Sequence, residues 1–434
     1  MKISQKSNSG LIIILILALL PILLWLIFPA PLPRFSSLTI GLSNIGQIFG
    51  LVGASLFAIN LILSARFKSL EKIFNGLNGV YLQHDQLGQI ALMLLLFHPL
   101  LLIPKYASGS FVNAALFLLP SANIAINLGI YSLALMIFLI ILTLYLRPKY
   151  NIWKWTHKFL GLAFFLASIH IWLIPSDISR NIPLRTYMLG LSIIAILCFI
   201  YKSLLGNIFI KKFEYIVTEI KLLNDSTVKI TMKSNSKQLT FSAGQFIFVS
   251  FQSEISSESH PFTISSSPDE KELIITAKNL GDYTKKLANL KIGTITKIEG
   301  PFGVFSYKNS GHKNQIWIAG GIGITPFLSM IKTLQQNDNH NIDLYYCTRN
   351  ESEIIYPDFL KNISSSLNNS LRIINHYSDS QGFINADIIK KMSVDLIDKD
   401  LFICAPPPMI RSLKKQFIAK GVNKKFIYSE EFNF

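Results

Sequence analysis

The sequence predicts a multi-domain chain of three parts: a six-helix transmembrane bundle, an antiparallel β-barrel domain and an α/β domain with a parallel sheet. Half of the 434 residues are hydrophobic, but they are unevenly spread. Long apolar runs fill the first part, short alternating stretches follow, and a strand–turn–helix pattern ends the chain. A chain of this length accommodates about three domains. We place them at residues 1–210, 211–310 and 311–434.

Six segments of the first part are long and apolar enough to cross a bilayer, whose hydrocarbon core requires roughly 20 helical residues. Soluble helices of this length normally carry a charged face, which these segments lack. The expected spans are Leu11–Phe28, Thr39–Ala65, Leu87–Pro104, Ile124–Leu146, Thr156–Ile174 and Tyr187–Leu205. The first is long for a signal peptide and has no clean cleavage site, so we count it as a membrane helix.

The net charge of +16 indicates membrane orientation rather than nucleic-acid binding. Residues 1–210 hold 14 basic and three acidic residues, whereas residues 211–434 hold 27 basic and 22 acidic ones. With the N-terminus inside, the inner loops carry twelve basic residues and the outer loops four, as the positive-inside rule requires. We therefore predict a multi-pass protein of the inner (plasma) membrane with both termini in the cytoplasm. Three scattered cysteines imply no disulfide framework.

Four histidines lie within or at the start of two expected spans, His84 and His98 on one and His157 and His170 on the other. Ionisable residues inside a span are costly and point to function. Their spacings correspond to about 21 and 19.5 Å of helix, which suits one site near each leaflet. Imidazole is a common axial ligand of haem iron. We predict two haem b groups, an inner one on His84 and His157 and an outer one on His98 and His170, without covalent attachment.

The rotation of the four side chains is less regular than their depth. At about 100° per residue, His84 and His98 differ by about 40°, whereas His157 and His170 differ by about 140°. Either an irregularity in the second helix or haems approached from different sides makes up the difference. For any single histidine, an interfacial residue or a kink at His98-Pro99 is the alternative interpretation.

After residue 212 the composition changes to alternating stretches broken by Ser, Asn and Gly turns. The expected strands of a compact β-barrel, which runs to about Tyr307, include Thr227–Met232, Gly244–Phe251 and Leu273–Ala277. The pattern then becomes parallel α/β, with a helix from Thr325. Its expected strands are Ile316–Ala319, Asp343–Cys347, Leu371–His376 and Leu401–Cys404.

The segment His260-Pro-Phe-Thr263, followed by two serines, resembles the flavin-binding motif of the ferredoxin-reductase superfamily. It is similar to the variant of the NADPH oxidase and ferric reductase group, which has His where soluble members usually have Arg. Segments 281–284 and 300–303 resemble the pyrophosphate-side elements, where glycines let backbone N–H groups approach phosphate. The resemblance implies FAD contacts at His260, Pro261, Phe262, Thr263, Ser265, Ser266, Gly281, Thr284, Gly300 and Gly303.

Two further segments resemble the nicotinamide-nucleotide motifs of that superfamily. Residues 319–326, Ala-Gly-Gly-Ile-Gly-Ile-Thr-Pro, follow a predicted strand and open a helix, and residues 404–409 follow a later strand. The resemblance implies nucleotide contacts at Gly320, Gly321, Gly323, Thr325, Pro326, Cys404 and Pro406. It also implies an aromatic residue over the flavin that moves when nicotinamide enters. Phe434 fits that role with Phe432 as its rival, so Cys404 and Phe434 are the expected catalytic residues.

Arg349 follows the strand that ends at Cys347. An arginine at this position clamps a 2′-phosphate bidentately, and we expect no acidic residue nearby to bind a ribose 2′-OH instead. The residue therefore favours NADPH as the nucleotide, with NADH possible. An ordinary solvated charge is the alternative interpretation.

The membrane half resembles the ferric-reductase-like transmembrane domain through its paired histidines. Together the resemblances imply a flavocytochrome b that passes electrons from cytosolic NADPH through FAD and two haems to the outer face. Oxygen, giving superoxide, is the expected acceptor, and a ferric chelate is the alternative. Eukaryotic oxidases of this group carry extra outer-face His and Arg residues, whereas Leu102 stands four residues after His98 here. An electron relay to a membrane or periplasmic partner protein and a haem-free scaffold are the other hypotheses.

Overall fold

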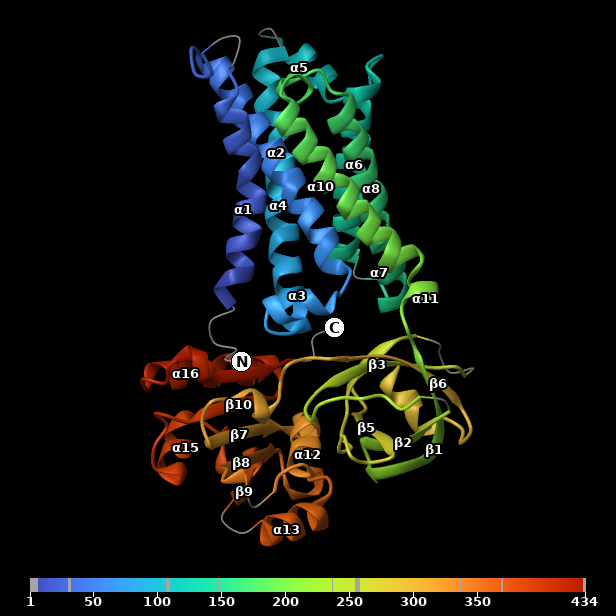
Figure 1. The fold of residues 1–434 in the computed structure, drawn as a ribbon, viewed down its shortest axis with the longest axis vertical. Helices are drawn as coiled ribbons and strands as arrows, with labels where there is room; N and C mark the ends of the chain where they lie inside the picture. Colours follow the sequence, from blue (N-terminus) through green and yellow to red (C-terminus); the bar gives the residue numbers. More distant parts are fainter. Residues whose placement is uncertain are drawn as a thin grey trace. The chain divides into compact units, whose positions relative to one another are not determined.

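The computed structural model divides the chain into two compact units, a helical unit over residues 6–210 and a soluble-type unit from residue 211 onward (Figure 1). The structure describes residues 7–29, 33–106, 110–146, 148–235, 237–253, 258–335, 338–367 and 370–431. Phe434 and its rival Phe432 lie outside the described residues, so the expected role of the terminal aromatic remains a prediction. The further boundary near residue 310 also remains a proposal.

Among the described residues, the helical unit has six helices long and apolar enough to cross a membrane, which makes the chain a multi-pass membrane protein. The long helices are α1 (Ser7–Ile27), α2 (Leu38–Ser64), α4 (Leu77–Tyr106), α6 (Ile124–Ile141), the consecutive pair α7 (Tyr150–His157) and α8 (Phe159–Leu173), and α10 (Ile182–Phe199). π-Helical turns extend α6 (η2, Leu142–Leu146) and α10 (η3, Ile200–Leu204). The connecting helices are α3 (Lys68–Ile73), α5 (Phe111–Phe117), α9 (Asp177–Arg180) and α11 (Gly206–Phe209).

Two features of these helices differ from the simplest sequence expectation. Helix α4 begins at Leu77 rather than near Leu87, so His84 lies within the helix instead of at its start. The first turns of α4 contain polar residues around His84, so the sequence of these turns does not show the apolar run expected of a membrane span. The fifth span is interrupted at Lys158, between α7 and α8. This interruption is the kind of irregularity that the rotation of His157 relative to His170 requires.

Helices α2 and α4 pack closely because α2 presents three glycines to its neighbour. A Cβ atom added at Gly46 would lie 3.0 Å from the Leu101 Cβ, and one added at Gly53 would lie 2.8 Å from Leu95 Cγ. Gly50 lies between them on the same face. Small residues at such spacings let two membrane helices approach backbone to backbone. The α2–α4 interface therefore has no room for larger side chains at Gly46, Gly50 and Gly53.

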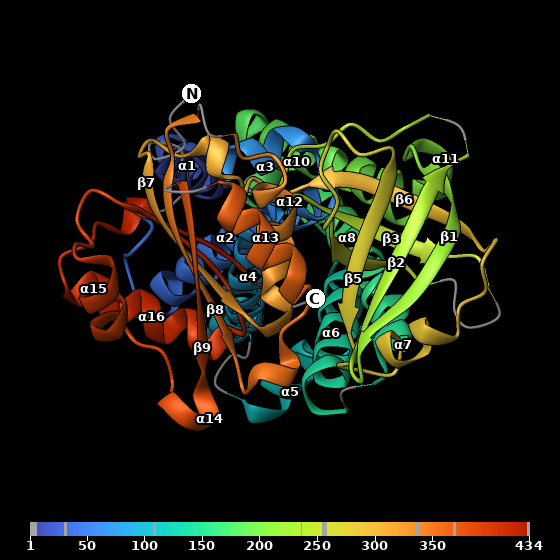
Figure 2. The same ribbon diagram turned by 90° about the horizontal axis from the view of Figure 1, so that it is seen from below.

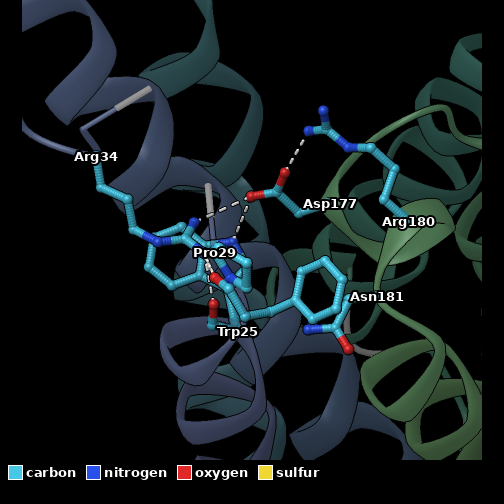
Figure 3. A pocket seen from close by; sticks show the side chains of 7 residues that line it. Trp25, Pro29, Arg34, Asp177, Arg180 and Asn181 are labelled. Carbon is cyan, nitrogen blue, oxygen red and sulfur yellow. Dashed lines mark hydrogen bonds and ion pairs between the residues drawn. The ribbon is translucent and has the colours of Figure 1, made fainter. Parts of the chain in front are cut away.

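A polar cluster ties α1 to α9 at one end of the bundle (Figure 3). The Asp177 carboxylate accepts hydrogen bonds from Trp25 Nε1 at 2.8 Å, Arg34 Nη1 at 3.1 Å and Arg180 Nη2 at 2.5 Å. The Arg34 guanidinium also lies 3.5 Å from the centre of the Trp25 ring. Nearby, Asn181 donates to the Leu24 carbonyl at 2.9 Å. These contacts fix the end of α1 against the rest of the bundle.

The first sheet of the soluble-type unit is antiparallel, with the order β4-β3-β6-β1-β2-β5. Its strands are β1 (Phe213–Asn224), β2 (Thr227–Ser234), β3 (Phe246–Phe251), β4 (His260–Thr263), β5 (Glu272–Lys278) and β6 (Ile295–Phe302). A single bridge between Ile264 and Ile275 joins the two edges. The domain is therefore barrel-like around an apolar core, which confirms the predicted antiparallel β-barrel class, although its two edge strands do not pair along a continuous ladder.

The second sheet is parallel, with the order β11-β10-β7-β8-β9. Its strands are β7 (Asn314–Gly320), β8 (Asn341–Thr348), β9 (Leu371–Tyr377), β10 (Asp400–Cys404) and β11 (Ile427–Glu430). Helices α12 (Thr325–Ile331) and α13 (Pro357–Ser366) cover one face, and α15 (Ala386–Ser393) and α16 (Pro407–Ala419) cover the other (Figure 2). The remaining turns are α14 (Ser378–Gln381), η4 (Thr284–Asn289), η5 (Tyr307–Asn309), η6 (Gly321–Ile324), η8 (Glu351–Glu353) and η10 (Lys424–Phe426).

The carboxyl ends of β7, β8 and β10 share one edge of the parallel sheet. Cys404 is level with Ala319 on one side and with Glu430 on the other. Ligands of open α/β sheets bind outside this edge. The loops that follow these three strands therefore mark the place to look for a nucleotide site.

Candidate functional site: paired histidines and a two-domain nucleotide edge

His84 and His157 face each other inside the helical unit. Their ring centroids are 6.2 Å apart and the ring planes are inclined by 59°. Two imidazoles that bind one metal ion through bonds of roughly 2 Å have ring centres about 6 Å apart. The spacing of these two rings therefore fits one metal ion between them.

Three of the four histidines hydrogen-bond to main-chain carbonyls of a neighbouring helix. These contacts join Nδ1 of His84 to Asn60 O (3.1 Å), Nδ1 of His98 to Gly46 O (2.7 Å) and Nδ1 of His170 to Ala125 O (2.6 Å). A carbonyl only accepts, so each Nδ1 carries the proton and each Nε2 keeps its lone pair. An imidazole oriented in this way is a prepared metal ligand. His157 has a different neighbour, the Trp153 ring, at a centroid distance of 5.2 Å.

His98 and His170 are also pressed against glycines. A Cβ atom at Gly50 would lie 2.7 Å from His98 Nδ1, and one at Gly129 would lie 3.0 Å from His170 Nδ1. Glycine at both positions is thus a requirement of the way these rings are seated.

The number of ligating side chains at the histidine sites distinguishes between a bare metal ion and haem iron. Among the described residues, no group of three or more His, Cys, Asp or Glu side chains is arranged to hold a bare metal ion. Two imidazoles suffice for an iron whose other positions are filled by a macrocycle. The residues present therefore fit haem better than an isolated transition-metal ion.

The flavin-motif residues gather at one end of the antiparallel sheet. The His260 ring stacks on Tyr283 with centroids 3.8 Å apart, and His260 Nε2 lies 3.0 Å from a carboxylate oxygen of Glu258. Phe262 lies beside the same tyrosine at 6.4 Å. Burial, and then the nearby Glu258 charge, raise the pKa of the Tyr283 hydroxyl well above its usual range. The structure thus brings His260 and Phe262 together around Tyr283, which lies within the 281–284 motif but was not among the expected FAD contacts.

The turn at residues 281–284 leaves open space beside the flavin motif. Thr284 Oγ1 accepts hydrogen bonds from the backbone N–H groups of Leu280 and Gly281, at 2.9 and 3.1 Å. A Cβ atom at Gly281 would meet no heavy atom within 4 Å. Packing within the protein therefore does not require glycine at this position.

Ser265 and Ser266 use their hydroxyl groups within the protein. Ser265 Oγ donates to the Ile274 carbonyl and Ser266 Oγ accepts from the Ile274 N–H, both at 3.1 Å. The Ser266 carbonyl accepts from Ser329 Oγ of α12 at 2.6 Å. Ser266 thus contacts α12 through its carbonyl, and a direct contact between the two serine hydroxyls and flavin stays a prediction.

The two nucleotide-motif loops pack directly on one another. A Cβ atom at Gly323 would lie 2.0 Å from the Cys404 carbonyl oxygen, and one at Gly320 would lie 2.9 Å from Pro406 Cδ. Gly321 has a φ of +55°, which glycine adopts without strain. Beyond the loop, Thr325 Oγ1 donates to the Ile322 carbonyl at 3.0 Å, and Pro326 enters the first turn of α12. The structure thus brings both motifs to the same edge of the sheet.

Glu430 is a buried acid that the sequence comparison missed. It lies level with Cys404 on β11, its Oε2 has no hydrogen-bond partner, and its Oε1 lies 3.3 Å from where a Cβ of Gly303 would be. Burial raises the pKa of Glu430 to about 8. Burial, and then the Glu430 charge, raise the pKa of the Cys404 thiol well above its ordinary value. Gly303, which follows β6 and has a φ of +93°, reaches this edge, whereas Gly300, with a φ of +146°, packs on Ile247 of the antiparallel sheet.

Arg349 lies at the same edge, after β8, but it is not alone there. Its guanidinium is paired with Glu353, and its side chain is 72% exposed. Glu353 therefore lies beside Arg349 and pairs with it, and the expected contact of Arg349 with a 2′-phosphate stays a prediction. The sequence signal was an i, i+4 Arg–Glu spacing across a turn, which becomes a contact only once the turn is formed.

Three known protein families match consecutive parts of the chain. Residues 49–168 match "Ferric reductase like transmembrane component", residues 212–329 match an FAD-binding domain, and residues 317–415 match "Oxidoreductase NAD-binding domain". The class is therefore a membrane oxidoreductase with an FAD- and nicotinamide-nucleotide-binding module. In this order the three matches are the domain architecture of the NADPH oxidase and ferric reductase family.

Relatives of the soluble-type half are reductases and related flavoproteins. The chain is 30% identical over 188 residues to flavohemoprotein B of Dictyostelium discoideum, covering 39% of this chain and 44% of that protein. It is 32% identical over 168 residues to NADH-cytochrome b5 reductase 1 of Aspergillus terreus, covering 35% of this chain and 56% of that protein. The chain thus spans about half the length of these curated relatives.

Solved structures also match over the second half. The flavohem-like FAD/NAD binding domain of nitric oxide dioxygenase from Vibrio cholerae is 21% identical, with a TM-score of 0.45, over 51% of this chain and 98% of that one. A ferredoxin NADP+ reductase from Neisseria gonorrhoeae with bound FAD and NADP is 18% identical, with a TM-score of 0.46, over 51% of this chain and all of that one.

Proposed function

We propose that the chain is a transmembrane flavocytochrome that passes electrons from cytosolic NADPH, or NADH, to an acceptor at the outer face. The reductase module and the ferric-reductase-like membrane component support this order of sites. The observation that carries the proposal is the seating of the histidines. Two of them face each other at 6.2 Å, and three hold Nδ1 on main-chain carbonyls so that Nε2 is left for a metal.

In this proposal His84 and His157 hold an inner haem b, and His98 and His170 hold an outer one. When bound, FAD accepts a hydride from the nicotinamide and releases electrons singly, and the haems relay them across the bilayer. The carbonyls of Asn60, Gly46 and Ala125 fix the imidazole tautomers. Because they also polarise the N–H bonds, they raise the basicity of the ligating nitrogens.

At the cytosolic end, we propose that the residue 260–263 segment, Gly281, Thr284, Gly300 and Gly303 hold FAD, and that Gly320–Pro326 with Cys404 and Pro406 hold the nicotinamide nucleotide. Cys404 is a buried neutral thiol, so it shapes the nicotinamide pocket rather than acting as a nucleophile. Glu430 lies beside Cys404, and its raised pKa of about 8 keeps this carboxyl group mostly protonated at neutral pH. Phe434 is proposed to cover the flavin until the nicotinamide enters.

The proposed acceptor is oxygen. Single-electron delivery at the outer face suits it, because one electron converts oxygen to superoxide. A ferric chelate is the second candidate, supported by the ferric-reductase match of residues 49–168. The positive-inside distribution of Lys and Arg supports the inner membrane, with both termini in the cytoplasm.

The test is NADPH-driven reduction of cytochrome c by the purified, FAD-supplemented protein in air, with and without superoxide dismutase. Loss of most of the signal with dismutase supports oxygen as the acceptor. If cytochrome c reduction is absent or insensitive to dismutase, and ferric citrate is reduced without oxygen, the proposed acceptor is a ferric chelate instead of oxygen. A purified protein that lacks haem when haem supply is ample contradicts the proposal as a whole.

A further inference from the structure

The segment that follows β8 lies at the carboxyl edge of the parallel sheet and contacts both domains of the soluble-type unit. It begins with Arg349, forms the turn η8 and ends at Tyr356, which has a left-handed φ of +56°. The Tyr356 hydroxyl lies 3.0 Å from Thr276 Oγ1 on β5 of the barrel-like domain. The segment therefore contacts β8 of one domain and β5 of the other. Its side chains line the sheet edge at which a nucleotide would bind.

Arg349 is held by a carboxylate in the same turn. Glu353 Oε1 accepts from Arg349 Nε at 2.8 Å and from Nη2 at 2.5 Å, and Glu353 Oε2 lies 3.3 Å from the Arg349 backbone nitrogen. The Nε–Nη2 edge is one of the two edges that a guanidinium offers to a phosphate. That edge is already occupied, and the positive charge is balanced by Glu353.

Glu353 has a second cation from the other domain. Lys278 Nζ, at the end of β5, lies 3.4 Å from the same oxygen, and the Glu353 side chain is only 14% exposed. Burial favours the neutral acid, but hydrogen bonds from Arg349 and the charges of Lys278 and Arg349 together outweigh it and keep the pKa of Glu353 below its usual value. The carboxylate is therefore charged at neutral pH and is shared between Arg349 and Lys278.

We propose that Glu353 is a specificity-determining residue that competes with the 2′-phosphate of NADPH for Arg349 and so brings the affinities for NADPH and NADH close together. The inference rests on the proposed function, because it takes a nicotinamide nucleotide as the electron donor. When a 2′-phosphate takes Arg349, Glu353 keeps its contact with Lys278, and the carboxylate is not left unpaired. NADH, which lacks this phosphate, leaves the Arg349–Glu353 pair in place.

The sharpest variant is Glu353→Gln in the full-length protein. The amide keeps the size and a hydrogen bond to Arg349 but removes the competing charge. We expect the NADPH affinity to rise by about twofold to fivefold relative to that for NADH, which is the upper range for one partly exposed charge pair. Arg349→Ala should have the opposite effect and remove the advantage of the 2′-phosphate. Glu351→Gln is the matched control, because it removes an exposed charge from the same turn.

The readout is anaerobic bleaching of the flavin absorbance by NADPH and by NADH, measured against nucleotide concentration. This step needs neither haem nor an outer acceptor. An unchanged NADPH-to-NADH ratio in Glu353→Gln, or an equal change in Glu351→Gln, overturns the inference and leaves the proposed function standing. If neither nucleotide reduces the flavin of the unaltered protein, the proposed function itself fails. Weaker discrimination by Glu353→Gln at high salt would agree with a Coulombic origin.

Discussion

The helical and soluble-type units hold their candidate ligands by different means. In the helical unit, main-chain carbonyls orient His84, His98 and His170, and glycines let two of these rings reach a neighbouring helix. In the soluble-type unit, side-chain pairs such as Arg349–Glu353 do the corresponding work. Main-chain acceptors move only when helices move, whereas side-chain pairs respond to charge and pH. Steric changes should therefore harm the first unit most, and charge changes the second.

The largest effect is expected from removing a ligand. His98→Leu should remove one of two haems per chain and reduce outer-acceptor reduction to background, because iron loses one of two axial ligands. Flavin reduction by nucleotide should continue. The haem-to-flavin ratio measures the first outcome, and His340→Leu in the soluble-type unit is the control. If His98→Leu and His84→Leu change the spectrum of the same haem, the proposed pairing by depth is wrong.

Gly50→Ala tests whether helix packing seats the outer imidazole. The new methyl group would lie 2.7 Å from His98 Nδ1, so the ring must move. Overpacking of this kind costs about 1–3 kcal/mol, which is roughly a tenfold or greater loss of haem affinity. Gly129→Ala, with its closest approach at 3.0 Å, should have a smaller effect. Titration of apo-protein with haem measures both.

Gly190→Ala is the control for the glycine series, since a Cβ there meets nothing within 4 Å. It should bind haem like the unaltered protein and gain slightly in helix stability. A loss of haem in Gly190→Ala equal to that in Gly50→Ala would mean that any change in these helices disturbs the site, and the packing argument would fail.

In the soluble-type unit, Glu430→Gln should change the pH dependence of stability. The folded-state pKa of Glu430 is raised by burial to about 8 from an ordinary value of 4.5, so the native state binds the proton more tightly. Its contribution to stability is present below the ordinary value and is lost as pH rises through about 8. The glutamine variant should lack this decline, which amounts to a few kcal/mol. Thermal unfolding of the full-length protein in detergent from about pH 5 to about pH 9 measures it.

The smallest effect is expected at the end of α1. Asp177→Asn keeps the shape but weakens three hydrogen bonds, two of them from arginines (Figure 3). We expect a loss of about 1–3 kcal/mol in the free energy of unfolding, with unchanged haem content. Thermal unfolding in detergent is the measurement. Unchanged stability would show that the apolar packing of α1 alone positions this end of the helix.

The parts of the fold that depend on local sequence were predictable. Apolar runs indicated six spans, alternation indicated the antiparallel sheet, and glycine turns after strands indicated the parallel one. The first turns of α4 were missed because Gln83, His84 and Asp85 interrupt the apolar run, and a polar stretch inside a bundle looks like a loop in the sequence. The barrel-like form of the first sheet was predicted correctly, but the single bridge between its edges, Ile264 to Ile275, has no local sequence signal.

The sequence predicted the site residues that are unusual by themselves. It did not predict those whose importance depends on a contact with a partner. The four histidines stand out because ionisable residues are rare in spans. The carbonyl acceptors at Asn60, Gly46 and Ala125 carry no sequence signal, since every residue has a carbonyl group. Glu430 and Glu353 were missed for a related reason: an acid becomes notable only when folding buries it or sets it against a cation.

The seating of His98 has a mechanical consequence. The length of the hydrogen bond from His98 Nδ1 depends on the separation of α2 and α4, because its acceptor is the Gly46 carbonyl and the ring packs on Gly50. A thicker or thinner bilayer that changes the tilt between these helices stretches or shortens that hydrogen bond. The basicity of the free imidazole nitrogen changes with it, and so does the reduction potential of a metal bound there. If His98 holds the proposed outer haem, we expect lipid composition to change the reduction potential of that haem.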